Sequence, residues 1–458
     1  MLDTRSSDAP PIPGSSGGLR RRELCAASIG AVVESFDWSL YAVFTVFFTA
    51  DLFGSDSPGA TVVAYGGFAV GFLARPLGSM VFGRISDRRG RRFNLMLCMS
   101  IISAASLAIA ALPTAATIGI WSAVAMVALR IVQGLAYGGE GPTVAAYVAE
   151  TAPRWHRFLF SAISYGGIMV GSLLVFASAA VLKATIGADA LRAGGWRWGF
   201  VAGGLLGLLA LWIRAFAPES EEFERAHSAE APRDKVSLRS LGGHSIALMS
   251  IFLISLGGTI TYYFSLVYLP KLAGGASASQ AADATSFMAV VVAVVLVAML
   301  VVGALADRIG LVPIMRITFG YNAIVVLPVS FGLLHGRIPF EIASVVLGLG
   351  SAGFAALGSV LFALLLPVRM RALAAGVVTM ATTAAFGGTF PMIAELLRGA
   401  GLRDAIPVYV FVAALAPLVG SFTVTKVPLF AKTFSKQSAH VEQGAGRPLQ
   451  SPSAQRTV

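Results

Sequence analysis

Twelve long apolar segments follow one another along the chain, separated for the most part by short polar stretches. Each is about 20 residues long or longer, the length that one helix needs to cross a bilayer. The segments lie at 24–48, 60–83, 93–112, 118–147, 159–182, 197–216, 244–269, 284–305, 313–334, 339–366, 371–396 and 405–426. The pattern predicts an all-α integral membrane protein with twelve transmembrane helices.

The longest polar stretch between two segments divides them into two sets of six. We expect a disordered cytoplasmic N-terminus at 1–22, six-helix bundles at 23–216 and 244–427, a cytoplasmic linker at 217–243 and a cytoplasmic tail at 428–458. The turn after the second segment of each half carries a similar sequence, at 83–92 and at 303–310. This repetition predicts two pseudo-symmetric bundles.

Composition agrees with a bilayer as the main solvent. Apolar residues make up 56% of the 458 residues and charged residues only 12%, about half the share found in soluble domains. Two cysteines and five scattered histidines give no disulfide framework and no metal-binding spacing. We therefore expect no catalytic residue, no metal site and no cofactor, and the chain does not have the pattern of an enzyme.

The net charge of +11 is explained by topology. Of the 34 Lys and Arg residues, 25 fall in the termini and alternate loops on one side of the predicted bilayer, and six fall on the other side. The positive-inside rule then places both termini in the cytoplasm. We expect a multi-pass protein of the plasma (bacterial inner) membrane that acts as a monomer and binds no nucleic acid.

Few ionisable residues fall inside the predicted spans, and such residues are functional candidates because burying them in a bilayer is costly. They are Glu34, Asp37, Arg75, Arg130, Glu140, Arg197 and Glu395. Nearly all of them lie in the first half of the chain.

Glu34 and Asp37 are three residues apart, so they share one face of the first span. Two carboxylates this close repel each other, and a low dielectric favours the neutral form, so either can take up and release a proton. This predicts proton coupling. The alternative is that both simply pair with Arg75 or Arg130 as buried ion pairs.

Arg130, Gln133 and Tyr137 point broadly to one face of the fourth span. A guanidinium beside an amide and a phenol is suited to hold a carboxylate of the substrate. Gly134 and Gly138 between them form a pair that lets a neighbouring helix approach closely. The alternative here is an arginine satisfied by Glu34 or Asp37.

These motifs resemble a known family. The turn at 83–92 looks like the signature loop of major facilitator superfamily transporters, and 130–139 is similar to their fourth-span signature. The stretches 30–41, 72–78 and 138–140 resemble the metabolite:proton symporter subfamily. Residues 195–200 and 210–214 look most like its alpha-ketoglutarate permease branch.

The resemblance implies roles for individual residues. Arg130 would take part in proton coupling, and Arg75 and Arg197 in binding a dianionic substrate. We also expect Tyr41 to bind substrate. The residues that would form the cytoplasmic gate are Gly83, Asp87, Arg88, Gly90, Arg91, Glu150 and Asp307. The sequence departs from the subfamily pattern at Ala31, at 35–36, at 141–142 and at 311–313, positions that touch the expected cavity and gate.

We therefore expect a secondary active transporter that takes up a small organic anion, such as a di- or tricarboxylate, together with protons by alternating access. A zwitterion such as a betaine and an aromatic acid are alternative substrates. An exporter or antiporter of the same fold is the alternative direction. A membrane-embedded sensor is disfavoured, because the linker and tail are too short for an added domain. An intramembrane enzyme is disfavoured, because no nucleophile with a base and no set of metal ligands converges in the spans.

Overall fold

The computed structural model describes residues 17–55, 57–89, 91–138, 156–215, 243–273, 278–367 and 374–430, and within them the chain is helical with no strand. The first half contains α1 (Gly17–Phe53), α2 (Pro58–Arg89), α3 (Arg91–Ala110), α4 (Ala115–Ile118), α5 (Trp121–Gly138), α7 (Arg157–Ile186), α8 (Ala188–Ala190), η1 (Leu191–Gly195) and α9 (Arg197–Ala215). The second half contains α11 (Ser245–Tyr262), η3 (Tyr263–Tyr268), α12 (Leu269–Ala273), α13 (Ala278–Ile309), α14 (Leu311–Leu334), α15 (Phe340–Leu364), α16 (Gly376–Thr382), η6 (Thr383–Gly387), α17 (Phe390–Gly399) and α18 (Ala405–Val424).

The helices match the predicted spans closely. Among the described residues, eleven helices are long and apolar enough to cross a membrane. A twelfth span is formed if Ala188–Gly195 and Arg197–Ile213, bent by 64° at their junction, count as one. One difference lies at the start of the chain, where α1 begins at Gly17, so the end of the stretch expected to be disordered is helical. A helix extends beyond an apolar span at little cost, because propagation adds one hydrogen bond per residue.

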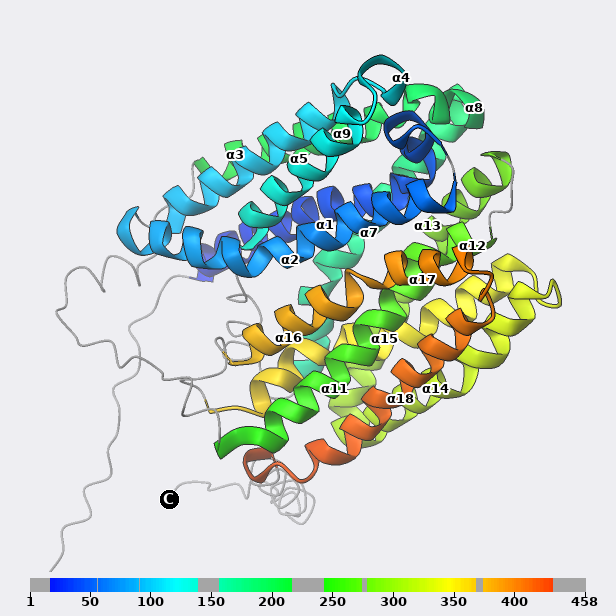
Figure 1. The fold of residues 1–458 in the computed structure, drawn as a ribbon. Helices are drawn as coiled ribbons and strands as arrows, with labels where there is room; N and C mark the ends of the chain where they lie inside the picture. The colour runs from blue at the N-terminus through cyan, green and yellow to red at the C-terminus, as the bar shows by residue number, and fades with distance from the viewer. Residues whose placement is uncertain are drawn as a thin grey trace, which may run out of the picture.

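The two halves form two six-helix bundles, with the first above the second in Figure 1. The bundles lie close together near α12 and α17 and splay apart towards the end where α2 finishes and α11 begins. We call this the basic end, because α2 closes there with Arg88 and Arg89, and the other the far end.

Two helix pairs join the bundles in different ways. Helices α7 and α13 run antiparallel in contact along their whole length, from Asp307 against the start of α7 to an ion pair between Lys183 and Asp283 at the far end. Helix α2 contacts η6 and α17 through its far half, where Phe72 packs on Gly388. The bundles are therefore closed over each other at the far end.

Glycines bring α2 and α5 together, as the spacing of Gly134 and Gly138 predicts. A Cβ atom on Gly134 would lie 2.1 Å from the carbonyl oxygen of Gly71, and one on Gly138 would lie 2.1 Å from that of Arg75. Gly78 is equally close to the backbone of Leu135. No side chain larger than hydrogen fits at these positions, so the two backbones touch directly.

Gly134→Ala should therefore destabilise the protein, because the added methyl group must push α2 and α5 apart. Overpacking of this kind costs about 1–3 kcal/mol, and we expect the melting temperature of the purified protein to fall by several degrees. Gly320→Ala on α14 is the matched control, since a Cβ there meets nothing within 4 Å. Equal melting temperatures for the two variants would contradict the α2–α5 contact.

Candidate functional site

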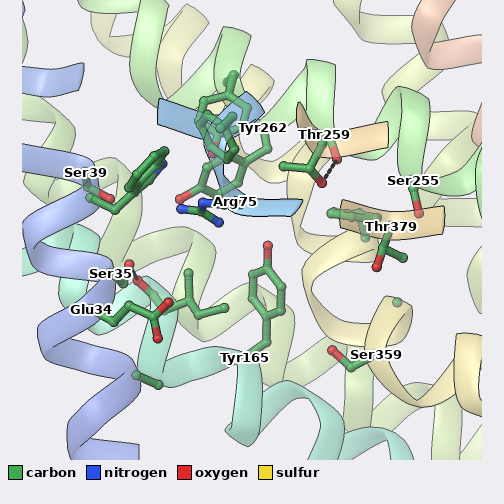
Figure 2. Close-up of a pocket in the computed structure, with 18 of the residues that line it drawn as sticks. Glu34, Ser35, Ser39, Arg75, Tyr165, Ser255, Thr259, Tyr262, Ser359 and Thr379 are labelled. Carbon is green, nitrogen blue, oxygen red and sulfur yellow. Dashed lines mark hydrogen bonds between the residues drawn. The ribbon is translucent and has the colours of Figure 1, made fainter. Parts of the chain in front are cut away.

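A cavity of about 440 Å³ lies between the two bundles. The first bundle lines it with α1, α2 and α7, and the second with α11, η3, α15, α16 and η6. Among the described lining residues, only Glu34 has a carboxyl group and only Arg75 a basic group, and the rest are aromatic, hydroxyl-bearing, small or aliphatic. Figure 2 shows Arg75, Glu34 and the Tyr165 hydroxyl facing the same space from three different helices.

The cavity wall on α1 follows from helical spacing. Ala31, Glu34, Trp38 and Ala42 recur every three or four residues, so they form one stripe along the helix, and all four line the cavity. Asp37 falls outside this stripe and is only 1% exposed. The structure thus separates the two carboxylates that the sequence placed on one face.

Aromatic rings hold the Arg75 guanidinium at the edge of the cavity. Its central carbon lies 3.8 Å from the centroid of the Trp38 ring, 4.4 Å from that of Phe72 and 5.2 Å from that of Tyr137. Within the described part of the chain, no carboxylate lies within ion-pair distance of it. A guanidinium held by ring faces keeps its hydrogen-bond donors available for an anion.

Asp37 lies behind the cavity wall in a dense hydrogen-bond network. Its carboxylate accepts hydrogen bonds from the Ser106 hydroxyl on α3 and from Gln133 Nε2 at 3.0 Å. The Tyr137 hydroxyl lies 3.0 Å from Asp37 Oδ2 and 2.8 Å from the carbonyl oxygen of Glu34. Donors from two neighbouring helices therefore surround this carboxylate, an arrangement that suits a buried negative charge.

Arg130 is fully buried and reaches Asp37 through Gln133. Its Nη1 donates to Gln133 Oε1 at 2.8 Å, while the Gln133 amide donates to Asp37 from its other end. The rings of Trp38 and Tyr41 each lie 4.4 Å from the guanidinium carbon. The sequence offered two alternatives for Arg130, a site for a substrate carboxylate and a direct pair with Glu34 or Asp37. In the structure Arg130 does not line the cavity, and its link to Asp37 passes through the Gln133 amide.

Tyr41 also lies away from the cavity. Its hydroxyl donates to the carbonyl oxygen of Ala64 on α2 at 2.7 Å, and its side chain is fully buried. Of the six residues expected to bind substrate, the structure therefore brings Arg75 to the cavity. It places Arg130, Gln133, Tyr137 and Tyr41 in the layer directly behind it.

Arg197 lies at the far end of the first bundle, outside the cavity. Its Nη2 donates to the carbonyl oxygen of Leu112 at 2.9 Å, and its Nη1 lies 3.6 Å from Asp51. Its guanidinium also covers the ring of Trp196, which donates to Asp51. Helix α9 begins at Arg197, which places the residue at a helix end and outside the cavity, so its contact with substrate stays a prediction.

The expected gate residues are described only in part. Asp307 at the end of α13 accepts hydrogen bonds from the backbone amides of Phe158 and Leu159, at 3.0 and 2.9 Å. These amides belong to the first turn of α7, whose donors have no partner within the helix. Gly83 and Arg88 lie on the last turns of α2. The structure does not describe Gly90, Glu140 and Glu150. Of Asp87 and Arg91 it describes the backbone but not the side chains.

Glu395 is fully buried at the far end, away from the cavity. Arg398 binds its Oε2 through two nitrogens, at 2.9 and 2.6 Å, and the Tyr268 hydroxyl donates to its Oε1 at 2.9 Å. This acid is therefore satisfied within the second bundle.

Two residues of the site had weak signals in the sequence. Ser106 is one of several serines in an apolar span, and only its contact with Asp37 distinguishes it. Trp38 lies between two candidate groups in sequence, but its position over two arginines depends on how α1, α2 and α5 pack. The hydroxyl groups of Thr259, Thr379 and Thr383 on the second bundle could not be told from packing residues.

Comparison with known proteins places this geometry in a family. The sequence model of the Major Facilitator Superfamily matches residues 27–336. The alpha-ketoglutarate permease of Escherichia coli is 30% identical over 411 residues, which cover 89% of this chain and 94% of the permease. The ectoine/proline transporter of Corynebacterium glutamicum is 31% identical, over 86% of this chain and 84% of its own length.

Solved structures agree on the fold. The crystal structure of a D-xylose-proton symporter superposes with a TM-score of 0.70 at 19% identity, covering 90% of this chain and 99% of the symporter chain. At this identity the likeness concerns the fold alone. Together with the match to the family over more than half of the chain, it leads to one conclusion: the protein belongs to the Major Facilitator Superfamily of membrane transporters.

Proposed function

We propose that this transporter carries a small organic anion together with a proton, with Arg75 as the anion site and Asp37 as the proton site. The observation that carries the proposal is the division between two layers. One guanidinium faces the cavity, and one carboxylate lies behind it, 1% exposed and linked to a second guanidinium through Gln133.

The chemistry of Asp37 supports its role as the proton site. Three side chains donate to the ionised carboxylate. Two of them, Ser106 and Tyr137, are hydroxyls, which can rotate and accept a hydrogen bond from the protonated acid instead. The same pocket can therefore hold either charge state of Asp37 without leaving a buried polar group unpaired.

The charge of the cavity supports a substrate with one carboxylate. The sequence predicts a di- or tricarboxylate, from three arginines and from the resemblance to the alpha-ketoglutarate permease branch. Arg130 is covered by Trp38 and Arg197 lies at the far end, so one guanidinium remains in the cavity wall. Among the lining residues that the structure describes, a second carboxylate would meet hydroxyl groups only, which compensate a buried charge less well than an arginine does.

A zwitterion is the second candidate substrate. Glu34 lines the same cavity as Arg75, so the described wall carries one acid and one base among aromatic rings. Such a wall suits a carboxylate joined to a methylated ammonium group, because quaternary ammonium ions bind to aromatic faces. Relatives of this chain include proteins described as proline/betaine transporters in Staphylococcus aureus.

We further propose that the basic end faces the cytoplasm, where the excess of Lys and Arg would place it. Alternating access then requires the two bundles to separate at one end while they close at the other. Asp307 supports a gate at the basic end, because it ties α13 of the second bundle to the first turn of α7 of the first.

The coupling is tested with purified protein in proteoliposomes and labelled 2-oxoglutarate, shikimate and glycine betaine. An inside-alkaline pH gradient should stimulate uptake of at least one of them. Asp37→Asn should remove this stimulation and retain exchange across a membrane without a gradient, because asparagine keeps the shape and binds no proton. Uptake of none of the three, or uptake that survives collapse of the gradient, would contradict proton-coupled symport.

The anion site is tested by giving two arginines the same substitution. Arg75→Gln should raise the half-saturation concentration for uptake about tenfold or more, the usual effect of losing a charge-assisted hydrogen bond. Arg197→Gln should leave that concentration unchanged and lower the melting temperature, since it removes the bonds to Leu112 and Asp51. The reverse pattern would place the substrate at Arg197.

The gate is tested by Asp307→Ala in a variant whose native cysteines are replaced by serine. Loss of two bonds between the bundles should favour the state open at the basic end, and a cysteine introduced at Ser359 in the cavity should react with a thiol reagent several-fold faster. Glu341→Ala is the control, because Glu341 lies in the first turn of its own helix α15. Equal labelling rates in the two variants would exclude Asp307 from the gate.

A further inference from the structure

Two arginines of different layers share one aromatic ring. The guanidinium carbons of Arg75 and Arg130 lie 3.8 Å and 4.4 Å from the Trp38 ring centroid. Arg75 faces the cavity, and Arg130 belongs to the network of Asp37. Trp38 is therefore a direct physical connection between the proposed anion site and the proposed proton site.

The Trp38 ring is held firmly in this position. It packs edge-on against Phe72 at 4.5 Å and against Tyr137 at 4.9 Å, and it contacts Phe68 at 5.5 Å. It is 6% exposed, so it separates the cavity from the layer behind it. The hydroxyl of Tyr137 binds Asp37, and the ring of the same residue packs on Trp38.

The charges around Asp37 decide the direction of the coupling. Arg130 and Tyr137 face it from α5 and Arg75 lies beyond Trp38 on α2, with Glu34 one turn earlier on α1. Helix α3 presents Ser106 and helix α9 presents a glycine, neither of which is charged. Arg75 and Arg130 contact the same Trp38 ring, and Arg130 is linked to Asp37 through Gln133. The positive charge of Arg75 therefore adds to that of Arg130 in favouring the ionised form of Asp37 in a low dielectric.

An anion on Arg75 reverses this effect. Its negative charge cancels the field of the guanidinium, and the protonated form of Asp37 becomes more favourable. By thermodynamic linkage, protonation of Asp37 then strengthens anion binding to the same extent. Anion and proton therefore bind cooperatively, which is the coupling that symport requires.

We propose that Trp38 is the positioning residue that couples the two sites, an inference that rests on the proposed function. The ring fixes both guanidiniums near each other and keeps cavity water out of the space between them. A smaller side chain would admit water and let the two guanidiniums move apart. Both changes weaken the Coulomb interaction through which the charge of Arg75 affects Asp37. Trp38 itself binds neither the proton nor the charge of the substrate.

The test is a double-mutant cycle that needs no substrate, since Arg75→Gln mimics neutralisation by an anion. The share of protonated Asp37 is read in a pH titration of the full-length protein from its infrared carboxyl band, identified by its loss in Asp37→Asn. In the otherwise native protein, Arg75→Gln should raise the ratio of protonated to ionised Asp37 about tenfold at a given pH. In a Trp38→Leu background, Arg75→Gln should change the ratio of protonated to ionised Asp37 less than about threefold.

Two further variants make the result decisive. Trp38→Phe keeps a smaller ring and should give an intermediate change, which covers the case in which the leucine variant does not fold. Phe354→Leu shortens another aromatic residue of the cavity wall whose ring contacts are with Tyr165 and Phe362, and the full tenfold change should persist there.

The inference fails if Arg75→Gln changes the protonation of Asp37 equally in the native, Trp38→Phe and Trp38→Leu backgrounds. It also fails if Arg75→Gln has no effect in the native background. Failure of the proposed function is seen separately, as absence of gradient-driven uptake in proteoliposomes. The infrared cycle does not depend on that result.

Discussion

The direct contact between the α2 and α5 backbones determines where the charges of this protein lie. Gly71 and Gly134 meet without side chains between them, and a Cβ atom on Gly71 would also lie 3.0 Å from Trp38. Arg75 is four residues beyond Gly71 on α2, and Arg130 is four residues before Gly134 on α5. The close approach therefore brings two cations towards one indole ring, an arrangement that wider helix spacing would not allow.

Two like charges in a membrane protein are tolerated only when their surroundings compensate for lost water. Ring faces provide part of this compensation for both arginines, through Trp38, Phe72 and Tyr41. For Arg130, Gln133 accepts a hydrogen bond from Nη1 and donates another to Asp37, while Nε and Nη2 have no hydrogen-bond partner among the described residues. For Arg75 we propose that a bound anion supplies the rest. The two arginines thus differ in their polar neighbours, because Arg130 is linked to Asp37 through Gln133 and Arg75 faces the cavity.

The contacts between the bundles are unequal, and this inequality favours movement at one side. The pair α7 and α13 is joined at both ends, by Asp307 at the basic end and by Lys183 with Asp283 at the far end. Within the described part of the chain, α2 meets η6 and α17 through its far half, where Phe72 packs on Gly388. Opening at the basic end therefore has to break the Asp307 bonds of the first pair, while the far-end contacts of both pairs can act as the hinge.

The sequence by itself determined the spans, the division into two similar halves and the identity of the costly buried residues. Each of these depends on local composition and spacing, which a bilayer constrains strongly because every span must be long and apolar. The sequence also predicted that Gly134 and Gly138 would meet another helix, since a pair of glycines four residues apart leaves a groove in any helix that carries it. It could not say that the partner is α2.

Only the tertiary structure decided which arginine faces the cavity. Arg75, Arg130 and Arg197 are alike in sequence, each an isolated cation in or at the end of an apolar span, and spacing within one helix cannot show which neighbour covers a side chain. Arg130 is enclosed by Trp38 and Tyr41 and bonded to Gln133. Leu112 and Asp51 hold Arg197, and Arg75 lines the cavity. The same is true of Glu34 and Asp37, which lie one helical turn apart on α1. Glu34 lines the cavity, whereas α3 and α5 close over Asp37 and hold it in a buried hydrogen-bond network.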